Sequence, residues 1–490
     1  MLSRNLLKIS SFLKKTGFFF TTVENPKHLK VRSPYSNEVV YETQYLELAQ
    51  ARTILKTTHQ AQHDWSQVPL ETRVASIQKF LEYFYINFEK IAKMITLQMG
   101  KPITQSRNEI KGMISRVKSM IDLAPKELNP EIIQTEASEF IQIAREPVGL
   151  VFIISPWNYP LLTTINTLIA AVLAGNTVVI KHSPYTPYCG KLFEEAFEHA
   201  GLKNIVNDCL VDLEDCQQLL ADPLVSYVSF TGSVASGKFV YEKVVSSRTT
   251  DFIDVGLELG GKDAIYVAED YDIKQAAEAL MDGAMYNAGQ SCCAVERIFV
   301  HKNVYDDFLQ HSGKFLSNYK LDDPLLEDTT MGPLTLPQAP ELLKQQIEDA
   351  VAQGGKLMIG GLPTTCGKGK GRFFDPSLVA GVENDMNMMV DESFGPIIGV
   401  NPVENDEEAL KLINETKFGL TAGIYTKDKE RAMKFVGKCN AGTVFMNRCD
   451  SLSPFLPWSG RKLSGKGVSL SRYGFHAVTR TKGYNFNLKK

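Results

Sequence analysis

The sequence predicts an α/β protein made of two doubly wound domains and a small β element that joins subunits. Apolar strands alternate with helical segments in residues 150–244, and a second series of such pairs occupies residues 264–353. This alternation is typical of parallel sheets covered by helices on both faces. Residues 129–146 and the segment from Gly474 have the alternating pattern of strands instead. We expect the edges of these two segments to need a partner.

The predicted elements follow in a simple order. Residues 45–126 are rich in helix formers with apolar residues three and four apart, which predicts helices, and residues 129–146 predict a hairpin. The first series of strand and helix pairs is 150–155 with 161–174, 177–181 with 190–199, and 226–231 with 237–244. The second series has strands at 264–267 and 297–301 and helices at 273–286, 304–314 and 340–353. From Gly474 we expect an exposed strand.

Length and composition exclude several classes of protein. The chain has 490 residues, 44% of them hydrophobic, which predicts about two to four compact units. Its 53 Lys and Arg residues nearly balance 56 Asp and Glu residues, so no broad cationic field favours nucleic acid or a membrane surface. The 8 cysteines show no C-x-x-C spacing, which predicts reduced thiols and no metal site.

One uncharged stretch, residues 149–180, has to be tested as a membrane span. Pro156, Asn158 and Pro160 interrupt it early, and its continuous apolar part, residues 161–174, is too short to cross the hydrocarbon core. A buried strand, a turn and a buried helix explain it better, so we expect no membrane span.

The N-terminus has the composition of a targeting segment. Residues 1–22 contain Arg4, Lys8, Lys14 and Lys15, no acidic residue, and a helical stripe of apolar residues. This pattern predicts a mitochondrial presequence, with a disordered basic tail as the alternative. The expected location is therefore mitochondrial, or cytoplasmic if the segment is only a tail.

Two glycine-rich segments, residues 232–239 and 256–263, come close to the phosphate-loop motif of nucleoside triphosphatases. Phe239 and Asp263 stand where that motif needs a hydroxyl for magnesium, which argues against such an enzyme. The first segment still follows a strand and opens a helix, and its glycines let backbone N–H groups approach a pyrophosphate. It therefore indicates a dinucleotide site.

Three residues in unusual local surroundings predict acyl chemistry. Cys292 lies in a stretch of small residues where a thiol can be partly exposed, although an isolated cysteine is usually a buried structural one. Glu258 is flanked by Gly256 and Gly260, and Asn158 stands between two prolines. A thiol nucleophile, a carboxylate base and an amide donor are the groups needed at an aldehyde carbon.

Six motifs carry a resemblance to a known family. They are PWNYP at 156–160, VVIK at 178–181, FTGSVASG at 230–237, ELGGK at 258–262, GQSCC at 289–293 and ESFGP at 392–396. In order and spacing they resemble the NAD(P)-dependent aldehyde dehydrogenase superfamily, from about Val23 to the end of the chain. The resemblance implies an aldehyde-dehydrogenase-like fold and oxidation of an aldehyde to the carboxylic acid with NAD or NADP.

The resemblance also implies the catalytic roles. Cys292 would be the nucleophile that forms a thiohemiacetal and then a thioester. The Asn158 side chain and the Cys292 N–H would stabilise the oxyanion, and Glu258 would activate the water that hydrolyses the thioester. Cys293 is expected to be a neighbour and not a second nucleophile.

The remaining site residues are implied in the same way. Lys181 would contact the adenosine ribose, Ser233 the pyrophosphate and Glu392 the nicotinamide ribose. The full expected cofactor site is Pro156, Trp157, Lys181, Gly232, Ser233, Gly237, Leu259, Glu392 and Phe394. The expected substrate residues are Tyr159, Asn166 and Trp458.

Departures from the family pattern bear on specificity. Pro184 stands where the family often has a glutamate that repels a 2′-phosphate, so NADP is expected to be accepted. His182 would attract that phosphate or point into the sheet. Thr163 and Arg461, together with the substrate residues, indicate a polar aldehyde or a semialdehyde.

The predicted domains are a nucleotide-binding domain at 23–128 and 147–258, a catalytic domain at 259–469, and oligomerisation strands at 129–146 and 470–490. The two strand segments predict a homodimer or homotetramer. Two rival functions remain open. Glu258 argues against a CoA-acylating semialdehyde dehydrogenase, which has no need of that base, and Cys292 argues against a non-catalytic binding protein on the same scaffold.

Overall fold

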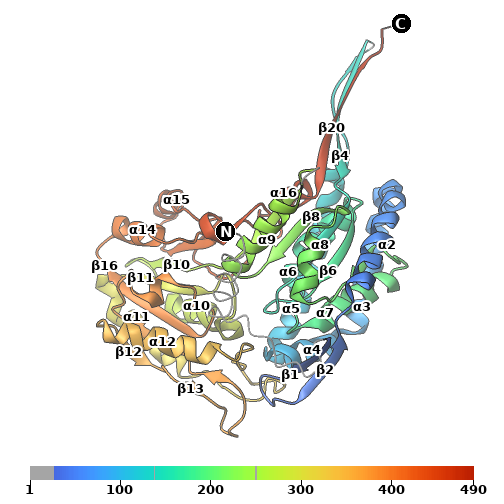
Figure 1. Ribbon diagram of the computed structural model, residues 1–490. Helices are drawn as coiled ribbons and strands as arrows, with labels where there is room; N and C mark the ends of the chain where they lie inside the picture. The colour runs from blue at the N-terminus through green and yellow to red at the C-terminus, as the bar shows by residue number, and fades with distance from the viewer. Residues whose placement is uncertain (1–26, 137, 249–250, 490) are drawn as a thin grey trace, which may run out of the picture.

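The computed structural model describes residues 27–136, 138–248 and 251–489. Two large sheets lie side by side, each with helices packed on it, and a narrow third sheet projects away from them (Figure 1). The predicted α/β class with parallel sheets is confirmed. The proposed presequence, residues 1–22, lies outside the described residues.

The first large sheet has six strands in the order β19-β9-β8-β5-β6-β7. All neighbouring pairs are parallel except β19 with β9. Its strands are β5 (Leu150–Ile154), β6 (Thr177–Lys181), β7 (Val206–Asp208), β8 (Val225–Thr231), β9 (Asp254–Glu258) and β19 (Gly465–Lys466). Strand order reverses between β5 and β8, and in such sheets ligands bind at the carboxyl ends beside the reversal.

Alternating side chains of β5 explain why this sheet is covered on both faces. Val151 and Ile153 pack into one buried cluster, while Leu150, Phe152 and Ile154 pack into another on the opposite face. The first cluster includes side chains of α3 (Leu70–Ile86), α5 (Ile103–Leu128), α6 (Leu162–Leu173) and α7 (Pro187–His199). The second includes those of α2 (Leu48–Gln67), α8 (Leu213–Leu220) and α9 (Val234–Ser247).

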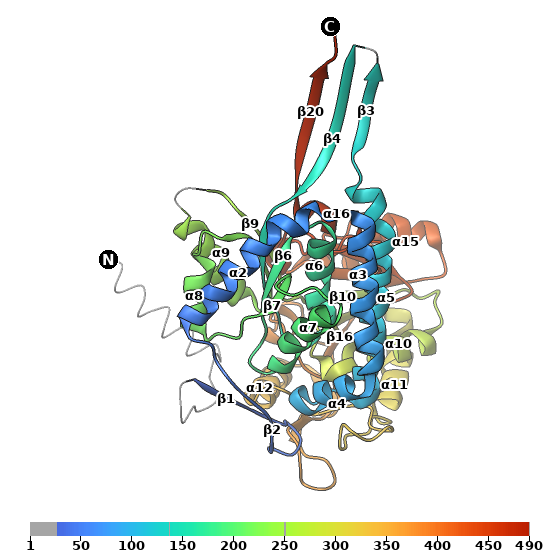
Figure 2. The same ribbon diagram turned by 90° about the vertical axis from the view of Figure 1, so that its right-hand side faces the viewer.

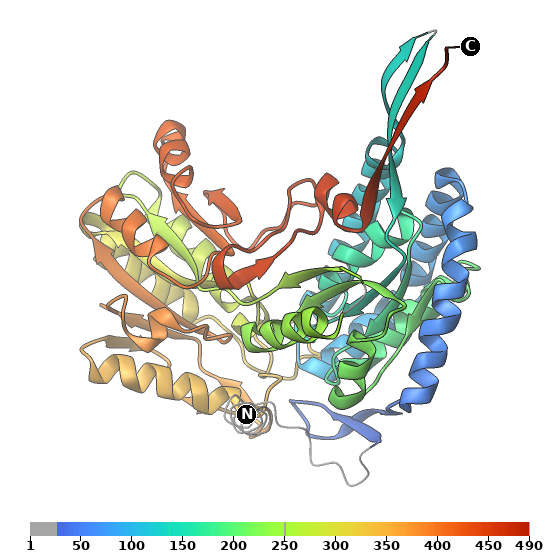
Figure 3. The same cartoon turned by 45° about the horizontal axis from the view of Figure 1, so that its top comes forward.

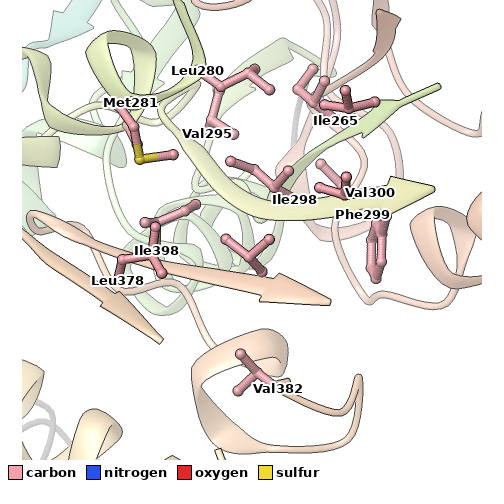
Figure 4. Close-up of a cluster of buried hydrophobic side chains, with 14 of the residues drawn as sticks. Ile265, Leu280, Met281, Val295, Ile298, Phe299, Val300, Leu378, Val382 and Ile398 are labelled. Carbon is pink, nitrogen blue, oxygen red and sulfur yellow. The ribbon is translucent and has the colours of Figure 1, made fainter. Parts of the chain in front are cut away.

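The second large sheet has seven strands in the order β12-β15-β16-β11-β10-β17-β18, parallel except for β12. The strands are β10 (Asp263–Val267), β11 (Val295–His301), β12 (Lys356–Ile359), β15 (Ser377–Ala380), β16 (Ile397–Val403), β17 (Thr421–Tyr425) and β18 (Thr443–Met446). Its helices are α10 (Ile273–Met285), α11 (Tyr305–Leu316), α12 (Ala339–Ala352), α14 (Asp406–Asn414) and α15 (Lys429–Val436). Figure 4 shows its core, where Ile298 of β11 lies among Ile265, Leu280 and Ile398.

The third sheet, which we call the arm, has three strands in the order β20-β4-β3. It joins the hairpin β3 (Glu131–Glu136) and β4 (Glu139–Pro147) to β20 (Thr479–Asn487), which runs antiparallel to β4 along its whole length (Figure 2). The predicted hairpin and the predicted C-terminal strand therefore pair with each other within one chain.

The expected start of the C-terminal strand at Gly474 is wrong. Gly474 lies in a short helix, α16 (Ser471–Ala477), and the strand begins at Thr479. The helix forms because Phe475 is fully buried against the core of the first sheet, and the Gly474 N–H donates to the Leu470 carbonyl. Before reaching α16, the chain crosses from β18 of the second sheet to β19 of the first (Figure 3).

Other elements complete the fold. The predicted N-terminal helices are present as α2, α3, α4 (Phe88–Met99) and α5. No prediction covered β1 (His28–Arg32), β2 (Val39–Gln44), β7, α8, β9 or, after α12, the strands β12 and β15 to β18 and the helices α14 and α15. The short elements are β13 (Pro363–Thr364), β14 (Phe373–Phe374), α13 (Asn387–Val390) and the 3₁₀ turns Tyr286–Gly289, Lys302–Val304 and Lys462–Ser464. In the described part of the chain, no helix combines the length and apolarity that crossing a membrane requires.

Candidate active site

A cavity of about 570 Å³ brings together residues that are far apart in the sequence. Cys292 and Glu258 both line it, as do the predicted substrate residues Tyr159, Asn166 and Trp458. Its walls come from α5, α6, α10, the end of β9 and the segment after β18. The cavity is therefore assembled from elements of both large sheets.

The loop before Cys292 has an unusual backbone. After α10 ends, Asn287, Ala288 and Gly289 all have left-handed conformations, with φ of 55°, 54° and 68°. Such values cost roughly 1 to 2 kcal/mol for a residue with a side chain. Gln290 secures this turn, since its side chain donates to the Asn287 carbonyl at 3.0 Å and accepts from the Thr335 N–H at 2.9 Å. The turn leaves the Cys292 thiol partly exposed in the cavity wall.

Asn158 lies against this loop. Its buried side-chain amide donates to the Gln290 carbonyl at 3.1 Å, and the Asn287 amide donates to the Asn158 carbonyl at 3.2 Å. A carboxamide has two N–H donors, so one remains for a ligand. The predicted oxyanion donor is thus fixed beside the segment that carries the thiol.

Glu258 ends β9, where it pairs with Gly465 of β19. Its carboxylate accepts a hydrogen bond from the Ser469 hydroxyl. Burial raises the pKa of Glu258 to about 6, while the hydrogen bond from Ser469 and the charge of Arg116 act in the opposite direction. A carboxyl with a pKa near 6 is mostly ionised at neutral pH and can accept a proton from water.

Cys293 has a different environment from Cys292. Its buried thiol donates to a carboxylate oxygen of Asp450 at 3.0 Å. A hydrogen bond with Cys292, followed by burial, raises the pKa of the Cys293 thiol well above its usual range. Since only the thiolate is nucleophilic, Cys293 is unsuited to attack an aldehyde.

The loop from Glu392 to Phe394 forms the predicted nicotinamide end of the cofactor site. Glu392 accepts the Gly261 N–H at 3.0 Å, and burial raises its pKa to about 8. A Cβ at Gly260 would lie 2.3 Å from the Glu392 carboxylate, so a larger residue there would displace this carboxylate. Phe394 has a left-handed φ of 52° and meets Trp157 edge to face at 5.6 Å.

The pyrophosphate end is predicted at the N-terminus of α9. Ser233 caps this helix, because its hydroxyl accepts the Ser236 N–H at 3.3 Å. A Cβ at Gly237 would lie 2.4 Å from the Leu259 side chain, and one at Gly232 would lie 2.7 Å from the Phe230 ring. These glycines let the loop, the helix and the segment after β9 pack closely.

The residues present fit a dinucleotide. The helix N-terminus after β8, Pro156 and Trp157 after β5, and Lys181 at the end of β6 all lie at the carboxyl ends of adjacent parallel strands. Backbone N–H groups at a helix N-terminus bind phosphate, and a lysine suits the adenosine end of the same ligand. NAD or NADP is therefore compatible with this edge of the first sheet.

The suggestion that His182 attracts a 2′-phosphate is wrong. His182 is fully buried, with its ring nitrogens against the Pro160 carbonyl at 3.1 Å and the Ser183 N–H at 2.9 Å. Burial lowers its pKa to about 4, so the ring is neutral at physiological pH. Lys181 is partly exposed and Pro184 carries no charge, so the argument for NADP depends on these two residues.

The predicted substrate residues have mixed environments. Tyr159 lies under the Lys101 ammonium, which is 3.9 Å from the ring centroid. Asn166 is buried and accepts a hydrogen bond from Arg116 at 2.5 Å, so its carbonyl is already engaged. Trp458 packs against Cys293 and lines the cavity.

The structure changes the expectations for two further residues, Thr163 and Arg461. Thr163 lines the cavity, but its hydroxyl donates to the Tyr159 carbonyl at 2.7 Å. Arg461 is exposed near Asn440 and is not part of the cavity wall.

Several residues of the site had no sequence signal. Ser469 donates a hydrogen bond to Glu258, and Arg116 donates one to Asn166, each from a distant position in the chain. Asp450 accepts a hydrogen bond from the Cys293 thiol. Arg448 also lines the cavity. Only the sheet topology brings these residues to the thiol. In the described part of the chain, no cluster of His, Cys, Asp or Glu side chains has an arrangement that could hold a metal ion.

Comparison with known proteins identifies the relatives of this chain. The profile of the "Aldehyde dehydrogenase family" matches residues 20–484. The chain is 30% identical to succinate-semialdehyde dehydrogenase [NADP(+)] of Deinococcus radiodurans, covering 92% of this chain and 93% of that protein. It is 29% identical to the crystal structure of lactaldehyde dehydrogenase from Escherichia coli, with a TM-score of 0.89 over 95% of this chain and 97% of the other. An NAD-dependent aldehyde dehydrogenase from Sinorhizobium meliloti gives 0.90 at 28% identity, covering 96% and 94%.

Proposed function

The chain belongs to the aldehyde dehydrogenase family, and from this premise we propose how its own residues carry out the reaction. The protein is an enzyme that oxidises an aldehyde to the carboxylic acid with NAD or NADP. The observation that supports the residue assignment is the shared cavity. The partly exposed Cys292 and Glu258 both line it.

Cys292 attacks the aldehyde carbon. Its thiolate sulfur forms a bond to the carbonyl carbon, and the carbonyl oxygen becomes an oxyanion. The free N–H of Asn158 and the Cys292 backbone N–H donate to this oxygen. Removing one such donor costs about 3 kcal/mol of transition-state stabilisation.

Collapse of the oxyanion leaves a thioester on Cys292. The nicotinamide, when bound, accepts the hydride that leaves the former aldehyde carbon. Glu392, Phe394 and Trp157 hold that end of the cofactor in place, since Phe394 and Trp157 meet edge to face and Glu392 is fixed by the Gly261 N–H.

Glu258 completes the reaction as a general base. It takes a proton from water, the resulting hydroxide attacks the thioester carbon, and the Cys292 thiolate leaves. This step distinguishes acid formation from transfer to CoA. Comparing product release with and without CoA tests it, because a CoA-acylating enzyme would be accelerated by CoA and would form acyl-CoA.

We propose that the preferred substrate carries a carboxylate in addition to its aldehyde. Six charged side chains line the cavity: Glu109, Arg116, Glu258, Asp282, Arg448 and Asp450. Among the described residues, every one except Arg448 has a hydrogen-bond partner within the protein. The planar guanidinium of an arginine matches a carboxylate through two parallel hydrogen bonds. Two relatives at 30% identity are succinate-semialdehyde dehydrogenases.

A matched pair of substrates tests this assignment. Succinic semialdehyde and butanal have the same chain length and differ in the terminal carboxylate. We expect kcat/KM to favour the semialdehyde by about tenfold or more, and Arg448→Met to remove most of that preference while changing butanal oxidation little. Equal preference in the wild-type enzyme, or stronger oxidation of a cationic aminoaldehyde, would contradict a carboxylate-bearing substrate.

We also propose the finer organisation of the chain. The nucleotide-binding domain would comprise 23–128 and 147–258, the catalytic domain 259–469, and the oligomerisation strands 129–146 and 470–490. The exposed arm supports a homodimer or homotetramer. The basic, acid-free residues 1–22 support mitochondrial targeting. Imaging the full chain and a chain without residues 1–22, each fused to a fluorescent protein, tests the last point.

A further inference from the structure

Two buried ion pairs contact segments that carry predicted site residues. Lys262–Glu296, the cofactor-side pair, has side chains that are 0% and 4% exposed, and Lys101–Glu109, the substrate-side pair, has side chains that are 0% and 1% exposed. Within the described ranges, no other ion pair has both side chains this deeply buried. Burying a lysine and a glutamate is seldom a net gain in stability over apolar residues of similar size. A role other than stability therefore has to be considered for both.

The cofactor-side pair secures the loop of Glu392 and Phe394. The Lys262 ammonium lies 2.5 Å from one Glu296 oxygen. That carboxylate also accepts the Ser393 N–H at 2.9 Å and the Phe394 N–H at 3.0 Å. Lys262 in turn donates to the Ser393 hydroxyl at 3.0 Å. The left-handed backbone at Phe394 is thus fixed by a charged acceptor that is itself neutralised by Lys262.

The substrate-side pair repeats this arrangement at the start of α6. Glu109 accepts the Leu161 N–H at 2.9 Å and the Leu162 N–H at 3.3 Å, and its second oxygen contacts the Lys101 ammonium. The same ammonium lies over the Tyr159 ring. These contacts fix the turn that carries Asn158 and Tyr159.

We propose that Glu296 and Glu109 are positioning residues with separate tasks. Glu296 holds the loop that contacts the nicotinamide end of the cofactor, and Glu109 holds the turn that contacts the aldehyde and its oxyanion. Each glutamate offers its carboxylate to two successive backbone N–H groups, and its buried lysine supplies the counter-charge. This inference rests on the site residues assigned in the proposed function.

Matched variants separate the two tasks. In Glu296→Gln, the new amide N–H₂ faces a backbone N–H, so the loop loses a hydrogen bond and Lys262 loses its counter-charge. We expect the Kd for NAD(P), measured without aldehyde by quenching of tryptophan fluorescence, to rise about tenfold or more, and the KM for aldehyde at saturating cofactor to change less than about twofold. Glu109→Gln should do the reverse, with a higher aldehyde KM, a lower kcat and an unchanged cofactor Kd.

A third variant distinguishes positioning from mere stability. Replacing the cofactor-side pair with apolar residues, in Lys262→Met with Glu296→Leu, removes both buried charges together, which such sites tolerate. We expect its thermal unfolding midpoint to recover relative to Glu296→Gln, while the cofactor Kd stays about tenfold or more above that of the wild type. Wild-type cofactor affinity in this double variant overturns the inference, and so does an equal shift of the same parameters in both single variants.

The cofactor Kd also separates this inference from the proposed function. It is measured without aldehyde and without turnover. A wild-type enzyme that binds NAD(P) but oxidises no aldehyde would contradict the function and leave the role of Glu296 testable.

Discussion

The cavity and the arm are organised in opposite ways. In the cavity, Cys292 and Glu258 lie in the wall of one space, with Ser469 hydrogen-bonded to Glu258 and Asn158 hydrogen-bonded to the loop that carries Cys292. The arm is a narrow sheet whose outer strands, β3 and β20, each have one neighbour in the described part of the chain. It also exposes apolar side chains, including Ile132 at 62% and Phe486 at 48%. The contrast teaches that the predicted catalytic residues come together through contacts within the chain, whereas the arm leaves strand edges and apolar side chains exposed.

The largest effect is expected from removing the nucleophile. Cys292→Ala should lower kcat/KM by about 10³-fold or more and abolish the burst of reduced cofactor. Stopped-flow absorbance of the reduced cofactor measures both. The elution volume of Cys292→Ala on a sizing column should be unchanged, because the substitution lies outside the arm. Retained turnover would mean that another thiol, such as Cys293, can act.

Removing the base should give a smaller and different loss. Glu258→Gln keeps the thiolate, so we expect a burst of about one equivalent of reduced cofactor per site, followed by turnover about 10²-fold or more slower. Mass spectrometry of the quenched enzyme should show the acyl group on Cys292. Normal steady turnover would disprove the role of Glu258.

Truncating the arm should change the assembly of the protein and not the chemistry of its site. Deleting residues 479–490 removes β20, uncovers β4 and should produce smaller or aggregated species. Light scattering coupled to size exclusion measures this, with Cys292→Ala as the control that changes chemistry alone. A sharp, fully active monomer would show that the arm is dispensable and would remove the contrast with the cavity.

Cofactor preference should change by about one order of magnitude. In Pro184→Glu, a carboxylate placed near the 2′-phosphate would weaken NADP binding, so kcat/KM with NADP should fall about tenfold while that with NAD changes little. In the wild type we expect the two cofactors to differ by less than about tenfold. A wild-type enzyme that rejects NADP strongly would mean that a group other than residue 184 discriminates.

The smallest effect concerns pH. With its pKa raised to about 6, Glu258 is protonated and inactive as a base at lower pH, so turnover should fall as the pH drops through about 6. Ser469→Ala removes a hydrogen bond that lowers this pKa, so the falling limb should move to higher pH. Steady-state rates across pH measure the shift. Ser451→Ala, in the same cavity, should leave the limb where it is.

The fold was largely predictable because its signals are local. Continuous apolar runs, such as β5 followed by α6, and amphipathic helices, such as α3, are recognisable from local sequence, whereas β7 has 3 residues and too little pattern to recognise. The boundary error at Gly474 arose because a short helix is held by the burial of Phe475, which its own sequence does not indicate.

The site was predictable only in part. Cys292, Glu258 and Asn158 stand in unusual local contexts, and their roles stay predictions that the geometry supports. Ser469, Arg116 and Glu296 carry no such signal, because their meaning depends on which segments the topology brings together. The direction of the His182 ring likewise follows from packing against Pro160 and not from its position after a strand.

The crossing of the chain from β18 to β19 has a consequence for synthesis. Ser469, which hydrogen-bonds Glu258, lies 211 residues after it in the sequence. At about 5 to 20 residues per second, the ribosome makes that intervening chain in about 10 to 40 s. During this interval β9 lacks its neighbour β19, and the base lacks its hydroxyl partner. A nascent chain that already contains Cys292 therefore still lacks the edge strand of its first sheet and the hydroxyl partner of Glu258.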